Sequence, residues 1–216
     1  MGIFTAIQTV IAHGGAAAWF ILASGVILAV LTYDRISTLY FKLSIQAQDA
    51  LTKVRQAVLR RDYNSAIQVC NSNLSSPELS VLKSGLLAIE HGREAIRSAL
   101  GGAVLDVTRK CERRVPLIAL IAGVSTLLGL LGTISGLIKT FEAIASADAS
   151  TKGELLGRGI SEAMYATATG LTIGVIAMII HTLCTSKTDD IVGNAQNAGY
   201  QLITWIEESE RGQSNG

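Results

Sequence analysis

One acidic residue lies in a strongly apolar part of the sequence. Glu162 stands near the start of an apolar run that extends from Gly159 to about Cys184. A helix rises about 1.5 Å per residue and the hydrocarbon core of a bilayer is about 30 Å thick, so the stretch from Glu162 to Leu183 is long enough to cross it. A charged side chain at that depth costs about 2.5 kcal/mol or more. We therefore expect Glu162 to face protein or water and to serve a function such as proton transfer.

Hydroxyl groups accompany this acid. Three threonines recur every seven residues along the preceding apolar stretch, which places them on nearly one helical face: Thr126, Thr133 and Thr140. Two more follow the acid, of which Thr169 shares the helical face of Glu162 whereas Thr167 lies about 140° around the helix. A single threonine in a membrane helix usually bonds to its own backbone, but three in register favour a wetted wall.

Small residues recur at steps of three and four in both apolar stretches. This pattern allows two helix backbones to approach closely, which is how helices pair inside membranes. The glycines that we expect in such packing are Gly129, Gly132, Gly136, Gly170 and Gly174.

Composition and charge favour a membrane protein. The 216 residues are 49% hydrophobic but only 5% aromatic, and the mean hydropathy is +0.41. The net charge of +1 gives no basic surface for nucleic acid. Thirteen of the 18 lysines and arginines lie between Arg35 and Arg114, so the positive-inside rule places that segment in the cytoplasm and the N-terminus in the periplasm.

The sequence therefore predicts an all-α, polytopic membrane protein with three transmembrane helices and long cytoplasmic helical extensions. The expected segments are an N-terminal amphipathic segment (1–13), transmembrane helix 1 (14–33), a cytoplasmic helical loop (34–114), transmembrane helix 2 (115–141), a short periplasmic loop (142–158), transmembrane helix 3 (159–184), and a cytoplasmic C-terminal helix and tail (185–216).

Local signals predict helices within the cytoplasmic segments. Asp62 is placed to cap a short helix through Cys70, followed by a turn over residues 71–75. Ser76 and Pro77 form a helix start, as N-cap and first helical residue, of a helix that we expect to reach His91. A further helix from Arg93 is expected to continue into the membrane. The acidic residues after Trp205 are expected to form a frayed, solvated end.

The sequence contains no arrangement typical of an enzyme or a metal site. Cys70, Cys111 and Cys184 have neither the spacing of a zinc site nor an even number for a disulfide framework. No Ser/His/Asp set or phosphate-binding loop is recognisable. We expect no cofactor, no metal and no catalytic activity.

Two stretches resemble the MotA/TolQ/ExbB proton channel family, most closely its ExbB and TolQ branch. They are residues 127–141 (LLGLLGTISGLIKTF) and 159–171 (GISEAMYATATGL), and weaker similarity touches most of the chain. Ser125 and Thr126 stand where the family commonly has Ala-Pro, a departure that bears on the local bend. The MotA branch usually has four spans and lacks the glutamate, whereas this chain has three spans and Glu162.

The resemblance implies a homopentamer around a central pore that holds a dimer of single-span partners of the ExbD or TolR kind. It implies an inner-membrane location and coupling of the proton motive force to work on periplasmic or outer-membrane machinery. The family's membrane glutamate corresponds to Glu162 and its pore threonines correspond to Thr133 and Thr167. Two alternatives stay open at this point: a non-conducting pentameric scaffold and a sodium-driven stator similar to MotA.

Overall fold

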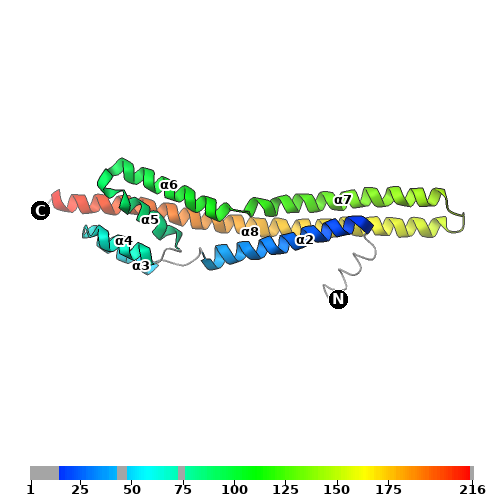
Figure 1. The fold of residues 1–216 in the computed structure, drawn as a ribbon, viewed down its shortest axis with the longest axis horizontal. Coiled ribbons are helices and arrows are strands. Elements are labelled where there is room, and N and C mark those ends of the chain that lie inside the picture. The colour runs from blue at the N-terminus through cyan, green and yellow to red at the C-terminus, as the bar shows by residue number, and fades with distance from the viewer. Residues whose placement is uncertain (1–14, 43–47, 73–75, 215–216) are drawn as a thin grey trace. The chain divides into compact units, whose positions relative to one another are not determined.

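The computed structural model describes residues 15–42, 48–72 and 76–214, and every element assigned there is helical (Figure 1). The elements are α2 (Gly15–Ile36), η1 (Ser37–Lys42), α3 (Gln48–Leu59), α4 (Tyr63–Ser72), α5 (Pro77–Leu87), η2 (Ile89–His91), α6 (Arg93–Glu112), α7 (Val115–Ala145) and α8 (Lys152–Ser214). The all-α prediction is thus confirmed for the described residues. The predicted amphipathic segment 1–13 lies outside them.

Three helical stretches are long and apolar enough to cross a membrane. They lie within Trp19–Leu39, Arg93–Ala145 and Lys152–Arg211. Their number agrees with the predicted three spans. Length and composition carry this assignment, since about 20 consecutive apolar residues suffice for a spanning helix.

The chain divides into two compact units. Unit 1 comprises Met1–Asp34 and Arg114–Leu183, and unit 2 comprises Arg35–Arg113 and Cys184–Gly216. Helix α8 contributes residues to both units. Unit 1 therefore contains the predicted spanning segments, whereas unit 2 contains the short helices between them and the C-terminal half of α8.

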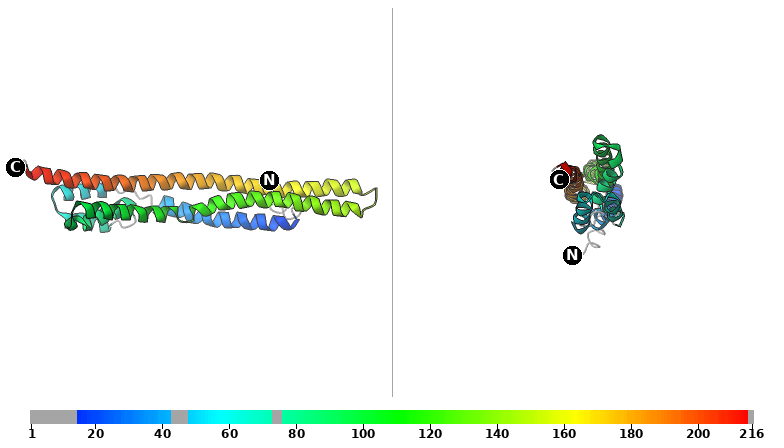
Figure 2. Two further views of the ribbon diagram at one scale, coloured as in Figure 1. Left: turned by 90° about the horizontal axis from the view of Figure 1, so that it is seen from above. Right: turned by 90° about the vertical axis from the view of Figure 1, so that its left-hand side faces the viewer.

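Unit 1 is built on an antiparallel pair, α7 and α8, which lie side by side in both lengthwise views (Figures 1 and 2). Helix α2 joins the pair through Ser24, whose hydroxyl lies 2.9 Å from that of Ser125 on α7 and donates to the Ile21 carbonyl at 2.7 Å. Gly25 lies against Ile173 of α8. Small residues at these contacts let three backbones approach closely.

The hairpin between α7 and α8 is tighter than the sequence indicated. Most of the predicted loop 142–158 is helical, because α7 extends to Ala145 and α8 begins at Lys152. A turn closed by the Thr151 amide and the Asp148 carbonyl, 3.0 Å apart, connects the two helices. Alanine has the highest helix propensity, so the alanines before Ser146 keep this part of the chain helical although it is polar.

A break separates α6 from α7, so the helix from Arg93 does not continue unbroken into the apolar stretch. Helix α6 ends at Glu112, and Arg114 has a left-handed backbone with φ 66°. Pro116 in the first turn of α7 explains this, since proline has no N–H to donate to the carbonyl four residues earlier, that of Glu112, and its ring clashes with that carbonyl. The Arg114 guanidinium pairs with Asp34 at 3.1 Å.

Unit 2 has a core of large aliphatic side chains. The fully buried members include Leu79, Leu82, Leu86 and Leu202. The α5 start at Pro77 is confirmed, but the Ser76 hydroxyl donates to the Glu78 carboxylate at 2.6 Å instead of capping the helix. The helix predicted to reach His91 ends at Leu87 and is followed by the 3-10 turn η2, with Gly92 at φ 89° before α6.

Helix α4 has the predicted cap. The Ser65 amide donates to the Asp62 carboxylate at 3.1 Å, and hydrogen bonds from Ser65 lower the pKa of Asp62. The helix continues to Ser72, so the first two residues of the turn predicted over 71–75 are helical, and residues 73–75 lie outside the described part.

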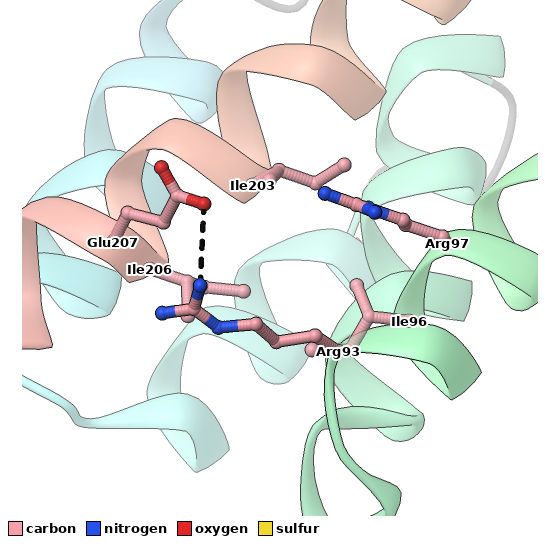
Figure 3. A pocket seen from close by; sticks show the side chains of 6 residues that line it. All are labelled: Arg93, Ile96, Arg97, Ile203, Ile206 and Glu207. Atoms are coloured by element: carbon pink, nitrogen blue, oxygen red, sulfur yellow. Dashed lines mark ion pairs between the residues drawn. The ribbon is translucent and has the colours of Figure 1, made fainter.

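The C-terminal part of α8 differs from the predicted frayed end. The helix continues to Ser214. Arg93 at the start of α6 forms an ion pair with Glu207 at 3.6 Å (Figure 3) and a second one with Glu210. Arg61 adds a hydrogen bond to the Ser209 carbonyl at 3.0 Å. Two of the acidic residues that the sequence suggested were only solvated, Glu207 and Glu210, therefore pair with α6 within unit 2.

Candidate functional site

Two threonines from different helices meet in unit 1. The hydroxyls of Thr133 on α7 and Thr167 on α8 are hydrogen-bonded to each other. Thr133 also lies 3.3 Å from the carbonyl oxygens of Gly129 and Ala163, and Thr167 lies 3.0 Å from that of Gly129. The residues that the sequence analysis singled out on separate spans are thus joined in one polar cluster, the threonine pair.

The threonine pair has more acceptors than hydrogens. Each hydroxyl carries one hydrogen and can accept two bonds. Thr167 can donate to Thr133 while Thr133 donates to the Ala163 carbonyl, or Thr133 can donate to Thr167 while Thr167 donates to the Gly129 carbonyl. Both arrangements satisfy the geometry, so the direction of donation within the pair is reversible. Such reversibility is what a hydroxyl in a proton path requires.

Glu162 does not join the threonine pair directly. Its side chain is half-buried and makes no hydrogen bond or ion pair with any residue that the structure describes. By helical geometry it lies about 140° around α8 from Thr167 and about 20° from Ile173, which lies against Gly25 of α2. The nearest link between acid and pair is the backbone, because Ala163, whose carbonyl faces Thr133, follows Glu162.

The other predicted threonines bond to their own helices. Thr126 donates to the Ala122 carbonyl at 3.0 Å, and Thr169 donates to that of Tyr165 at 2.8 Å. Thr140 is buried and donates to the Gly136 carbonyl at 2.7 Å. All three threonines of the seven-residue repeat lie along the contact between α7 and α8, where Thr126 meets Gly174 and Thr140 meets Gly159.

The predicted packing glycines lie where the two backbones are closest. A Cβ built on Gly170 would lie 2.6 Å from the Ser125 carbonyl oxygen, and one built on Gly129 would lie 3.2 Å from that of Ala166. Gly136 faces Ala163, Gly174 faces Thr126, and Gly132 is buried in α7. This close approach brings Thr133 and Thr167 within hydrogen-bonding distance.

One polar contact was not assigned from the sequence. The buried pair Ser24 and Ser125 joins α2 to α7 about two helical turns before Thr133. A lone serine inside an apolar span is a weak signal, since it usually bonds its own backbone, as Ser24 also does.

The described residues contain no group of three His, Cys, Asp or Glu side chains able to hold a metal ion. The three cysteines are buried and free, and burial raises the pKa of the Cys70 thiol to about 11.

Three apolar helices of spanning length define the class as a multi-span membrane protein, and an acid within such a helix typically marks a functional position. Residues 73–197 match the MotA/TolQ/ExbB proton channel family, and since they make up more than half of the chain, the chain belongs to that family. It is accordingly a multi-pass membrane component of energy-transducing systems of the ExbB and TolQ kind and not an enzyme.

Individual relatives agree with this membership. The biopolymer transport protein exbB1 of Vibrio cholerae is 27% identical over 195 residues, which cover 89% of this chain and 85% of the relative. The Tol-Pal system protein TolQ of Pseudomonas aeruginosa is 28% identical over 100 residues, 46% of this chain and 43% of the relative. TolQ of Haemophilus influenzae is 35% identical over 80 residues, 37% of this chain and 35% of the relative.

Proposed function

We propose that the chain is the proton-channel subunit of an inner-membrane motor that couples the proton motive force to work on periplasmic or outer-membrane machinery. It acts as a homopentamer around a central pore that holds a dimer of single-span ExbD- or TolR-like proteins. Glu162, Thr133 and Thr167 carry protons, Thr126 and Thr169 add hydroxyls along the same path, and the packing glycines hold α7 against α8.

The observation that carries this proposal is a threonine pair that bridges α7 and α8, together with an acid of α8 that has no hydrogen-bond or ion-pair partner among the described residues. A half-buried carboxylate near the end of a spanning stretch is costly to keep charged, so its presence calls for a function. Glu162 forms no ion pair or hydrogen bond with the described residues and so does not stabilise this protomer by such contacts. The reversible hydroxyls of the threonine pair bridge α7 and α8 on another side of α8, and the carbonyl of Ala163, the residue after Glu162, faces Thr133.

A partner with its own acid completes the path. Residues 14–33 and 115–141 contain no aspartate or glutamate, so Glu162 is the only side-chain carboxylate in the three predicted spans. Because Glu162 and the threonine pair lie on different sides of α8, a proton needs a further group or water to pass between them. A membrane aspartate on a second protein supplies such a group.

The topology that we propose follows the distribution of positive charge. The N-terminus and the hairpin around 142–158 are periplasmic, whereas residues 34–114 and 185–216 are cytoplasmic. In this orientation α8 begins at the periplasmic side, and Glu162 lies near the periplasmic end of the third span.

Proton flux through the reconstituted complex tests the role of Glu162. The chain is incorporated into liposomes with its single-span partner, and flux is followed with an internal pH indicator under an imposed gradient. Glu162→Gln is expected to abolish flux while leaving assembly intact, because the amide keeps the shape but cannot titrate. The matched control Glu154→Gln removes an exposed acid two turns earlier on α8 and is expected to leave flux unchanged.

The same assay separates the alternatives. Full flux in Glu162→Gln would contradict the titrating role of this acid. A scaffold would assemble normally yet show no flux in the unmodified protein, and a sodium-driven stator would respond to a sodium gradient instead of a proton gradient. Thr133→Val is expected to reduce flux strongly and Thr133→Ser to retain it, since serine restores the hydroxyl of the threonine pair.

A further inference from the structure

One cation lies inside a predicted span. Lys139 stands in the apolar stretch of α7, near the end that leads into the hairpin with α8, and its side chain is exposed. It forms no hydrogen bond or ion pair with the residues that the structure describes. We propose that Lys139 is the counter-ion of Glu162: it pairs with the ionised carboxylate and releases it on protonation. This inference rests on the proposed function, in which Glu162 carries protons.

The contact between α7 and α8 places Lys139 and Glu162 at nearly the same level. Gly136 of α7 faces Ala163 of α8, and a Cβ built on the glycine lies 3.2 Å from the Ala163 Cβ. Lys139 follows Gly136 by three residues, and Glu162 precedes Ala163 by one. Because the helices are antiparallel, both steps lead toward the hairpin, by about 4.5 Å and about 1.5 Å. The two charged residues are therefore only about 3 Å apart along the helix axes.

Both residues also lie on the same flank of the α7–α8 contact, the flank on which α2 packs. On α8, Glu162 lies about 20° around the helix from Ile173, which contacts α2. On α7, Lys139 lies about 40° from Ser125, whose hydroxyl is hydrogen-bonded to α2. Two side chains that leave neighbouring helices on one side and at one level can meet, because lysine carries its charge on a flexible four-carbon stem.

The surroundings favour such a pair. Both residues lie at the end of an apolar stretch, where opposite charges attract more strongly than in bulk water. Ionisable side chains in spanning helices typically pair with one another. Ionised Glu162 has no other partner among the described residues, whereas protonated Glu162 no longer attracts the lysine. Each proton transfer at Glu162 thus makes or breaks one contact between α7 and α8.

Arg158 is the other cation close to Glu162. It lies one turn before the acid on α8, and a base that precedes an acid is the less favourable order on a helix. Glu154, one turn before Arg158, offers this arginine a partner in the favourable order. Helix α2 carries no charged side chain from Gly15 to Tyr33, and the other titratable groups on the neighbouring turns are Glu142 of α7 and Tyr165 of α8. Lys139 is therefore the cation best placed for Glu162.

Chemical modification tests this pairing without any proton flux. A hydrophobic carbodiimide reacts with protonated carboxyl groups in membrane proteins, and peptide mass spectrometry identifies Glu162 as the modified residue. The pH at which half of Glu162 is modified is measured on the purified full chain in lipid nanodiscs. Lys139→Gln is expected to raise this pH by about one unit or more, because the ionised acid loses its counter-ion. Lys139→Arg should keep the original value, and Lys139→Glu should raise it further.

Two matched variants control for the loss of a positive charge. Lys152→Gln removes an exposed cation ten residues before Glu162 and is expected to leave the pH of half-modification unchanged. Arg158→Gln is expected to raise it less than Lys139→Gln does. An unchanged value in Lys139→Gln, or a larger shift in Arg158→Gln, would overturn Lys139 as the counter-ion. Full proton flux in Glu162→Gln would instead count against the proposed function, and the pairing measured by modification would stand.

Discussion

The two units of this protein differ in the residues that line their main helix contacts. In unit 1 the contact between α7 and α8 is lined by small buried residues such as Ala163, Ala166 and Gly170, while large side chains such as Leu127, 66% exposed, point outward. In unit 2 large residues fill the core, among them Leu82 and Leu202. Small residues thus dominate the α7–α8 contact of unit 1, whereas large apolar residues dominate the core of unit 2.

The solvent explains this difference. Lipid tails are as apolar as leucine, so burying a leucine within unit 1 gains little, and helices there associate through close backbone contact and interhelical hydrogen bonds. Water drives large apolar side chains into the interior of unit 2 by about 25 cal/mol per Å² of buried apolar surface. The proposed proton path depends on the first kind of packing, because only small residues bring Thr133 and Thr167 together.

Truncation of one leucine in each unit is expected to give the largest difference in lost stability between the two units. Leu202→Ala leaves a cavity in the core of unit 2 and is expected to cost about 2–5 kcal/mol. Leu127→Ala removes the same atoms from an outward position in unit 1 and is expected to cost far less. Thermal unfolding of the purified chain in detergent measures both changes, and an equal loss would contradict the contrast.

A methyl group added at three glycines should give three different outcomes. Gly170→Ala places a Cβ 2.6 Å from a backbone oxygen and is expected to cost about 1–3 kcal/mol. Gly85→Ala in unit 2 meets the side-chain ends of Leu100 and Leu202 at 2.7 Å, which can move, so its cost should be smaller. Gly102→Ala meets nothing within 4 Å and is expected to stabilise α6 by about 0.5–1 kcal/mol.

The melting temperatures of these three variants rank their effects on stability directly. If Gly85→Ala were as damaging as Gly170→Ala, side-chain packing in unit 2 would be as unyielding as the backbone contact in unit 1. That result would remove the distinction between the two kinds of packing.

The smallest expected effect concerns the helix cap in unit 2. Hydrogen bonds from Ser65 lower the pKa of Asp62 in the folded protein, so the cap contributes stability at pH values above the unfolded pKa of about 3.9. That contribution is lost as the pH falls through the lowered pKa of the folded state. Asp62→Ala should therefore reduce the melting temperature slightly at pH 7 and not in strong acid. If Asp62→Ala still lowered the melting temperature in strong acid, the charge of the Asp62 cap would not be the cause of the loss.

Local sequence patterns predicted much of the framework. The apolar stretches revealed three spanning helices, Asp62 and Pro77 marked two helix starts, and the position of Glu162 in an apolar run singled it out. These features depend on neighbours along the chain, so the sequence contains the information needed to predict them. The break at Arg114 could have been predicted in the same way, because Pro116 follows it by two residues and proline interrupts a helix.

Contacts between distant residues were decided by tertiary structure. The seven-residue threonine repeat suggested one wall, whereas packing against α8 directs its members to different partners and joins only Thr133 to Thr167. Likewise, α8 continues to Ser214 and its Glu207 and Glu210 pair with Arg93, where the sequence predicted a frayed end. The sequence by itself determined which residues are apolar, small or charged, and which stretches are helical. Which hydroxyl meets which, and which acid has a partner, depends on how the helices approach one another, because hydrogen bonds and ion pairs form only over a few ångströms.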